Sequence, residues 1–231
     1  MIPARGGSKA IPRKNLALLG GRPLIAYTVD AARASTVLAR VVVSTDDQDI
    51  AAAAKELGAD VPFLRPSHLA GDETPMLDVL LDLVDALEQR EAYRADILVL
   101  LQPTSPFRRA EQIDAAVDLL TRSGADSVVT VVPVPHQFSP ESLMQLHDNR
   151  LLPYVSGPAQ LRRQDKPRLF ARNGPAIVAV RTQVLTEQRT LYGVDTRGLV
   201  MTREESLDID DVFDLELAEL MLNARSGGTA T

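Results

Sequence analysis

Cysteine and tryptophan are absent from the 231 residues of this chain, and aromatic residues make up only 4% of it. Without cysteine the chain has no disulfide framework, no thiolate nucleophile and no thiolate metal ligand, which is typical of the reducing cytoplasm. The scarcity of aromatic residues argues against the base-stacking platforms that bind single-stranded nucleic acids. The three histidines, His68, His136 and His147, lack metal-ligand spacing.

Long apolar runs and an excess of positive charge are also missing. No apolar run approaches the roughly 18 residues that a membrane span needs, and residues 1–15 lack the apolar middle of a signal peptide. The net charge of -6 lacks the basic footprint of a nucleic-acid or membrane-surface binder. We therefore expect a cytoplasmic protein with no nucleic-acid or membrane partner, in which any basic site is local.

What remains is an ordinary globular composition in which short apolar runs alternate with longer amphipathic ones. The apolar runs predict strands within 40–45, 95–102, 126–134, 175–180 and 198–202. Helix-spaced apolar residues predict helices at 23–34, 49–57, 75–88, 111–123 and 212–224. This alternation predicts an α/β sandwich with a mostly parallel sheet, whose ligands bind at the carboxyl ends of the strands.

Regularity is lost between residues 135 and 168, a segment too long for an ordinary loop in a compact domain. It is interpreted as a lid, a dimerisation arm or a small subdomain. The tail at 226–231 is expected to be disordered, which leaves one domain over residues 1–225.

The first motif is the opening segment, which is too polar to be core. It reads MIPARGGSKAIPRKN, with Gly6, Gly7 and Ser8 among the cations Arg5, Lys9, Arg13 and Lys14. Glycines let backbone N–H groups approach a ligand closely, and cations neutralise phosphate oxygens. The order differs from a P-loop, in which the lysine precedes the serine or threonine. A turn with solvated charges is the alternative interpretation.

The second motif is SLDIDD at 206–211. In an extended segment, side chains two residues apart share a face, so Asp208 and Asp210 can point together at one hard cation. Alternatively, Asp210 or Asp211 caps the helix that begins near Val212.

A third motif, LLQPTSPFRR at 100–109, places Gln102 at a strand end with Ser105, Arg108 and Arg109 nearby. It is suited to binding a polar ligand, or it is a proline-rich turn whose hydroxyls satisfy backbone groups. The basic stretch at 162–175 is a solvated face, a subunit contact or a phosphate clamp. A basic loop at the start and a carboxylate pair near the end together suit magnesium-dependent attack on a nucleoside triphosphate.

The order of these motifs resembles one family. IPARGGSKAIPRKN, VVVSTDDQDIAAAAKELGA, FLRPSHLAGDETP, LLQPTSPFR, RRQDKPRLFARNGPAI and SLDIDD follow one another as in the acylneuraminate cytidylyltransferases, also called CMP-sialic acid synthetases. The resemblance spans nearly the whole chain. It implies a three-layer α/β/α sandwich with a Rossmann-like sheet of the nucleotide-diphospho-sugar transferase type, carrying a dimerisation arm at about 135–168.

The implied reaction joins CTP to a nonulosonic, sialic-acid-like sugar, giving the CMP-sugar and pyrophosphate with Mg²⁺ or Mn²⁺. The implied nucleotide site consists of Arg5, Gly6, Gly7, Ser8, Lys9, Lys14, Asn15, Arg65 and Thr74. Gln102, Asn173 and Arg163 are the implied sugar contacts, the last offered to the neighbouring subunit of a homodimer. Asp208 and Asp210 are the implied metal ligands.

Catalysis is then expected from Arg5, Lys9 and Asp210. In-line attack by the anomeric hydroxyl on the α-phosphorus calls for positioning and charge stabilisation. Asp210, water or a phosphate oxygen accepts the hydroxyl proton, since a metal-bound carboxylate is a poor base.

Two positions depart from the family pattern. Only Met1 to Ala4 precede the glycine loop, so the first strand is short or the native start lies upstream. Ala10 stands where the family has glycine, and it would strain the loop if that position had a positive φ.

Four hypotheses thus compete. Beside the nonulosonic-acid enzyme stands a cytidylyltransferase for 3-deoxy-manno-octulosonate or another 2-keto acid sugar. A kinase of the P-loop type would release ADP instead of pyrophosphate, and a non-catalytic protein would bind CTP without turnover.

Overall fold

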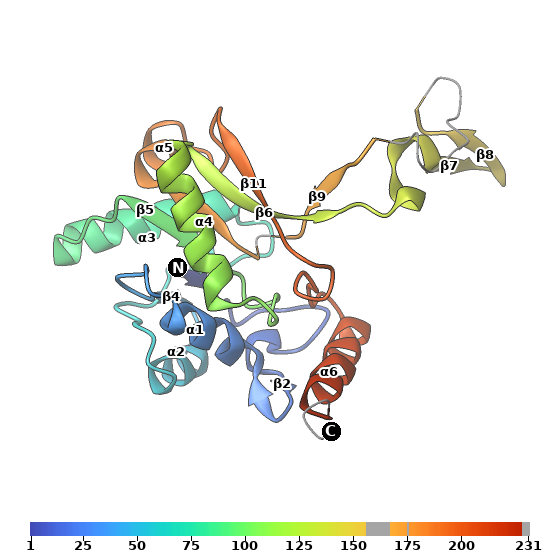
Figure 1. Cartoon of the computed structure of the whole chain (residues 1–231). Coiled ribbons are helices and arrows are strands. Elements are labelled where there is room, and N and C mark those ends of the chain that lie inside the picture. The colour runs from blue at the N-terminus through green and yellow to red at the C-terminus, as the bar shows by residue number, and fades with distance from the viewer. Residues whose placement is uncertain (156–166, 175, 228–231) are drawn as a thin grey trace.

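The computed structural model describes residues 1–155, 167–174 and 176–227 (Figure 1). Its strands are β1 (Ile2–Pro3), β2 (Leu18–Leu19), β3 (Arg22–Pro23), β4 (Val43–Ser44), β5 (Ile97–Leu100), β6 (Ser127–Pro133), β7 (Met144–His147), β8 (Arg150–Pro153), β9 (Phe170–Arg172), β10 (Val178–Arg181) and β11 (Thr196–Val200). Its α-helices are α1 (Leu24–Ala34), α2 (Gln48–Glu56), α3 (Met76–Glu91), α4 (Ala110–Ser123), α5 (Thr182–Glu187) and α6 (Val212–Gly227).

The central sheet has the order β4-β1-β5-β10-β6-β11. β1 pairs in parallel with β4, and β11 with β6. The Met1 nitrogen donates to the Val99 carbonyl at 2.7 Å, and Leu101 N donates to Met1 O at 3.0 Å, which joins β1 to β5 in the parallel pattern. β10 is antiparallel to both its neighbours, β5 and β6. The sheet is therefore mixed, with β10 reversed among strands that share one direction.

Helices cover both faces of this sheet, and successive strand residues pack against opposite layers. Val99 and Leu101 lie in one core cluster with residues of α1, α2 and α4. Leu98 and Leu100 lie in a second cluster with residues of α3 and α5. Because side chains alternate along a strand, apolar residues at every position indicate burial on both faces. The expected three-layer α/β/α sandwich is confirmed.

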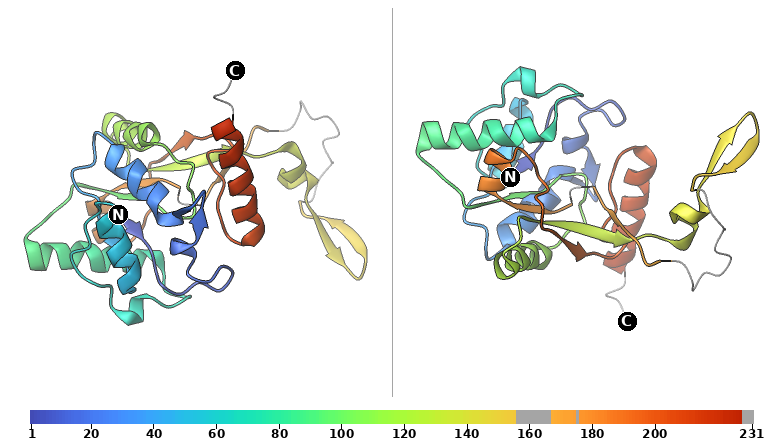
Figure 2. Two further views of the ribbon diagram at one scale, coloured as in Figure 1. Left: turned by 90° about the horizontal axis from the view of Figure 1, so that it is seen from below. Right: turned by 90° about the horizontal axis from the view of Figure 1, so that it is seen from above.

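A ribbon carries the chain out of the sheet. β9 pairs antiparallel with the end of β6, from Val131 to Pro133, and the short hairpin β7–β8 stands beyond it. Figure 2 shows this hairpin away from the helices in both views. Asp148 and Asn149 form its turn with φ values of 47° and 64°, the left-handed conformation that two-residue hairpins need. Every described residue of β7 and β8 is exposed.

The C-terminal helix α6 closes the other side of the molecule. Ala218 on α6, Leu19 on β2 and Ile209 share a small third core, and Gly20 N donates to the Glu219 carboxylate at 2.7 Å. Figure 1 shows β2 and α6, from opposite ends of the chain, side by side. Helix α6 continues past the expected boundary at residue 225, and residues 228–231 of the expected tail lie outside the described part.

No helix in the described part of the chain is long and apolar enough to cross a membrane.

Candidate functional site

The opening loop follows β1 at the carboxyl end of the sheet and is held by its own polar groups. Asn15, buried in the short 3-10 helix Lys14–Leu16, donates from Nδ2 to the Arg5 carbonyl at 2.9 Å. Gly6 N donates to Asp46 Oδ1 at 3.0 Å. A Cβ at Gly6 would lie 2.6 Å from Asp47 Oδ2, so only glycine fits this close approach. The loop is thereby packed against the turn that follows β4.

Backbone strain in this loop falls at a different residue from the one expected. Ala10 is not among the described residues with positive φ, whereas Arg13, three residues later, has a φ of 54°. The condition for strain at Ala10, a positive φ, is therefore not met. Arg13 is held in place by Asp49 Oδ2 at 2.6 Å, since Asp47 and Asp49 begin helix α2 beside it.

The two catalytic cations predicted in the loop meet one carboxylate. Arg5 Nη1 lies 2.6 Å from Asp72 Oδ1, and Lys9 Nζ lies 2.6 Å from Asp72 Oδ2. The ion pairs with Lys9 and Arg5 hold the pKa of Asp72 below its ordinary value. Gly7 is exposed and Ser8 half-buried beside them. Asp72 belongs to the turn Gly71–Thr74, in which Thr74 N donates to Gly71 O at 3.3 Å.

Arg65 anchors the segment that leads to the turn Gly71–Thr74. Its side chain is buried, Nε donates to Ser44 Oγ at 3.0 Å, and a second guanidinium nitrogen donates to the Ser44 carbonyl. Burial lowers the pKa of Arg65, and the nearby Asp46 charge partly offsets this effect. Arg65 therefore ties the segment before Thr74 to the end of β4.

Lys14 joins the two ends of the chain. Its Nζ donates to the carbonyls of Ile209 at 2.9 Å and Asp210 at 3.1 Å, and it lies 3.8 Å from Asp210 Oδ1. Ile209 N in turn donates to Thr104 O at 2.8 Å. The three motifs predicted to carry chemistry thus meet through backbone contacts.

The three aspartates of SLDIDD have different environments. Asp208 is largely buried, its Oδ1 has no hydrogen-bond partner among the described residues, and desolvation raises its pKa. Asp210 is exposed. Asp211 caps α6: its Oδ1 accepts from Asp214 N at 3.1 Å, and Asp214 Oδ2 accepts from Asp211 N at 3.1 Å. The capping interpretation therefore holds for Asp211, whereas the Asp208 carboxylate interacts with Thr104 and the Asp210 carboxylate with Lys14.

A buried Asp208 requires space that only glycine leaves. A Cβ at Gly174 would lie 2.7 Å from Asp208 Oδ2, and Gly174 has a φ of 59°. The preceding Asn173 is fully used by the fold: it accepts from Thr130 Oγ1 at 2.8 Å and donates to Ser206 Oγ at 2.8 Å. Asn173 thus fixes the loop that presents Gly174 to the carboxylate.

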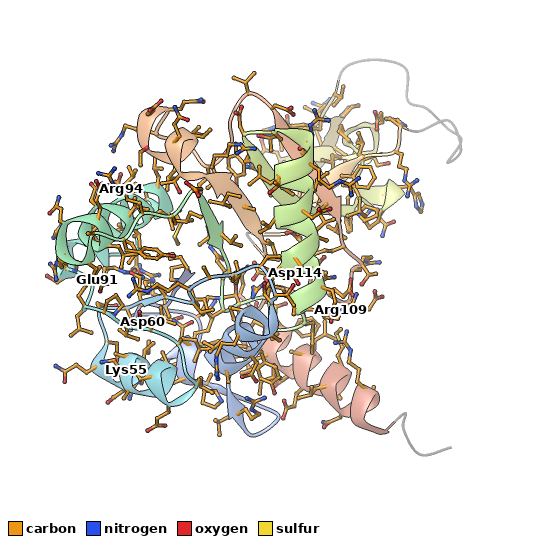
Figure 3. All side chains as sticks on the ribbon, turned by 60° about the vertical axis from the view of Figure 1, so that its left-hand side comes forward. Lys55, Asp60, Glu91, Arg94, Arg109 and Asp114 are labelled. Carbon is orange, nitrogen blue, oxygen red and sulfur yellow. The ribbon has the colours of Figure 1, made fainter. Side chains whose placement is uncertain are left out.

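In the segment after β5, Gln102 is half-buried and Arg108 is buried. Gln102 Oε1 lies 3.5 Å from Thr104 Oγ1. Arg108 donates to the carbonyls of Ala176 (2.6 Å) and Gln102, and has its pKa lowered to about 9 by desolvation. Arg109 lies at the start of α4 (Figure 3). It pairs with Glu205 at 2.7 Å. The expected cluster of cations around a ligand is therefore not formed by Arg108 and Arg109.

One predicted site residue, Arg163, lies outside the described residues. Asp72 was not singled out by sequence reasoning, although it belongs to the FLRPSHLAGDETP motif, because its contacts to Arg5 and Lys9 appear only in the fold.

The carboxylates suit a magnesium ion. Among the residues that the structure describes, no group of three or more His, Cys, Asp and Glu side chains could hold a metal. Mg²⁺, however, keeps several waters and takes one or two protein carboxylates together with substrate phosphates. The unpartnered, buried Oδ1 of Asp208 beside Asp210 fits that donor set.

Comparison with known proteins decides the family. A sequence model described as Cytidylyltransferase matches residues 1–219. The chain belongs to the cytidylyltransferase family. The resemblance that the motifs indicated is thereby confirmed.

Two curated relatives of this cytidylyltransferase show how far the similarity extends. It is 36% identical to the CMP-N,N'-diacetyllegionaminic acid synthase of Legionella pneumophila over 223 residues, which cover 96% of this chain and 94% of that protein. It is 32% identical to the N-acylneuraminate cytidylyltransferase of Escherichia coli over 94% of this chain but only 50% of that longer protein.

Among solved structures, a CMP:2-keto-3-deoxy-manno-octonic acid synthetase complexed with CTP matches with a TM-score of 0.73. The match covers 97% of both chains at 19% identity. At that identity the match supports the fold alone.

Proposed function

We propose that this cytidylyltransferase transfers CMP from CTP to the anomeric hydroxyl of a nonulosonic acid, a nine-carbon 2-keto sugar acid of the sialic type. The observation that carries the proposal is the bridge made by Lys14, whose Nζ holds the backbone carbonyls of Ile209 and Asp210 and so joins the cationic opening loop to the segment that carries Asp208 and Asp210. A relative of similar length whose name specifies such a sugar, the legionaminic acid synthase, supports the sugar class.

The chemistry follows from these residues. The anomeric oxygen forms a bond to the α-phosphorus while the bond from that phosphorus to the bridging oxygen of the β-phosphate breaks, and pyrophosphate leaves. Arg5 and Lys9 neutralise charge on the phosphate oxygens, with Gly6, Gly7 and Ser8 forming the loop around them. The hydroxyl proton passes to water, a phosphate oxygen or Asp210.

Asp208 and Asp210 would hold Mg²⁺, or Mn²⁺ in its place. When bound, the ion supplies charge stabilisation at the phosphate oxygens. Lys14 positions the segment that carries these aspartates by donating to the carbonyls of Ile209 and Asp210. Asn15 positions the opening loop by donating to the carbonyl of Arg5.

The remaining roles follow the arrangement around this centre. Arg65 and Thr74 line the cytosine side, with Arg65 acting as a buried support. Gln102 contacts the sugar acid directly, whereas Asn173 acts on the sugar side by fixing its loop.

We also propose a homodimer formed through the arm at about 135–168. The hairpin β7–β8 exposes Leu146 and Leu151, which lie opposite each other in register and are 66% and 62% exposed. Exposed apolar side chains gathered on one projecting element are typical of an interaction site. Arg163, which lies outside the described residues, is proposed to serve the neighbouring subunit's site in this dimer.

The position of a radiolabel separates this reaction from phosphoryl transfer. With the sugar acid and magnesium, label from the α-phosphate of CTP should appear in a sugar product and label from the γ-phosphate in pyrophosphate. Transfer of the γ-label to the sugar would instead indicate a kinase. Binding of CTP without movement of either label would indicate a non-catalytic protein.

A further inference from the structure

The contact between the opening loop and the turn Gly71–Thr74 has a role of its own. Arg5 and Lys9 are the cations assigned above to the triphosphate, and both already face a carboxylate at 2.6 Å. A phosphate group carries the same charge sign and the same kind of acceptor oxygen as Asp72. Asp72 and a phosphate group therefore compete for Arg5 and Lys9.

The turn that carries Asp72 is exposed, so Asp72 can separate from the two cations. Gly71, Asp72 and Glu73 are all exposed, and the turn is closed by the bond from Thr74 N to Gly71 O. The Asp72 side chain is 38% exposed and Lys9 is 84% exposed, so water can replace each partner when the pair separates. Exposed ion pairs of this kind are weak enough to be exchanged for a stronger ligand.

We propose that Asp72 is an intramolecular competitor of phosphate at Arg5 and Lys9, which weakens every ligand that uses both cations and promotes release of pyrophosphate. This inference rests on the proposed function, because it takes these two cations as the triphosphate site. A site that must first release Asp72 binds such ligands with an affinity reduced by the fraction of molecules in which the cations are free. That reduction is the same factor for CTP and for pyrophosphate.

The test is the substitution Asp72→Asn, with binding measured by calorimetry in the absence of a sugar acid, so that no turnover occurs. We expect CTP and pyrophosphate to bind tighter by the same factor, about three- to tenfold at low salt. Cytidine, which has no phosphate, should bind as before. The gain should shrink as ionic strength rises, because salt screens exposed charges.

The matched control is Glu73→Gln, which removes the same charge one residue along the turn, where Asp72 and not Glu73 pairs with the two cations. It should change the affinity for pyrophosphate by less than about twofold. Both variants are expected to fold, since both side chains are exposed. If thermal melting shows that Asp72→Asn does not fold, Asp72→Ser takes its place.

The possible results test the role of Asp72 separately from the proposed reaction. Equal pyrophosphate affinity in wild type and Asp72→Asn would overturn the competitor while leaving the proposed function standing. Weaker binding by the variant would also overturn it, and would show that Asp72 organises the cations for the ligand. Failure of CTP to bind any form of the protein would count against the proposed function.

Discussion

At the scale of single residues, the aspartates near the C-terminus are divided by their partners. The carboxylate of Asp211 caps the first turn of α6, whereas Asp210 lies 3.8 Å from Lys14 Nζ of the opening loop and Asp208 is largely buried beside Gly174. We therefore expect adjacent residues of identical chemistry to have separable roles, Asp210 in the proposed catalysis and Asp211 in stability.

Comparing Asp210→Ala with Asp211→Ala tests this division. Asp210→Ala should lower turnover by at least about a hundredfold with little change in thermal stability, because it removes a proposed metal ligand from an exposed position. Asp211→Ala should retain turnover and lose about 1 kcal/mol of unfolding free energy with the helix cap. Turnover and chemical denaturation of both variants measure the two effects. Near-normal turnover of Asp210→Ala at limiting magnesium would remove Asp210 from the metal site.

Gly174 gives a second test at this scale. Gly174→Ala places a Cβ where Asp208 Oδ2 lies 2.7 Å away, so the carboxylate must move. We expect the magnesium concentration for half-maximal activity to rise several-fold, and Mn²⁺ binding by electron paramagnetic resonance to weaken in parallel.

The control is Gly124→Ala, because Gly124 has a φ of 71° with no atom within 4 Å of an added Cβ. Both variants should lose about 1 kcal/mol of stability from the positive φ. An equal shift in metal dependence for the two variants would show that Gly174 acts only through backbone strain.

At the scale of elements, helices α1 and α4 are joined by a carboxylate. Asp114 on α4 lies near α1 in Figure 3 and accepts from Ser35 Oγ at 2.5 Å and from the backbone and hydroxyl of Thr36 at 3.1 and 2.6 Å. Burial acts to raise the pKa of Asp114, but these hydrogen bonds outweigh it and hold the pKa below its ordinary 3.8.

A carboxylate with a lowered folded-state pKa contributes stability above its unfolded pKa and loses it as the pH falls through the folded value. Asp114→Asn should therefore destabilise the protein by about 1 kcal/mol at pH 7, with the difference shrinking as the pH falls below 3.8. Asp118→Asn, which breaks a surface pair with Arg122 on the same helix, should change stability by less than about 0.5 kcal/mol. A difference for Asp114→Asn that persists unchanged in acid would contradict the assignment.

The hairpin β7–β8 is the second element with a testable role. The double substitution Leu146→Lys with Leu151→Glu keeps a cross-strand pair but removes the apolar face, so the proposed dimer should dissociate at micromolar concentration without unfolding. Light scattering after gel filtration measures the mass. Val194→Glu, at a residue 98% exposed elsewhere on the surface, is the control and should leave the mass unchanged. A doubly substituted protein with the same mass as wild type would place any dimer contact elsewhere.

At the scale of the whole molecule, apolar runs predicted more than polar motifs did. The strands at 95–102 and 126–134 and the helices α1 to α4 lie where the periodicity placed them, because burial on one or both faces leaves a direct signal. The reversed direction of β10 could not be predicted, since a strand buried on both faces reads the same in either direction. The hairpin β7–β8 was missed although Asp148 and Asn149 are typical of a two-residue turn.

The meeting of the three motifs was predicted for a physical reason. Chain-distant loops meet at the carboxyl end of the sheet, so the opening loop, the Gln102 segment and the acidic segment could be placed together from the sequence alone. The sequence could not show which polar side chains make their hydrogen bonds within the fold. Asn173 and Arg108 bond to partners distant in sequence, and Asp211 bonds to the first turn of α6.

The most direct test of cytidylyl transfer to a nonulosonic acid is pyrophosphate release in the presence of magnesium. Each of the four nucleoside triphosphates is combined with sialic, legionaminic, pseudaminic and octulosonic acids. We expect release with CTP alone, and with a nine-carbon acid in preference to the eight-carbon one. Release with the octulosonic acid alone would contradict the proposed sugar class, and release with another nucleotide or with none would contradict cytidylyl transfer to these acids.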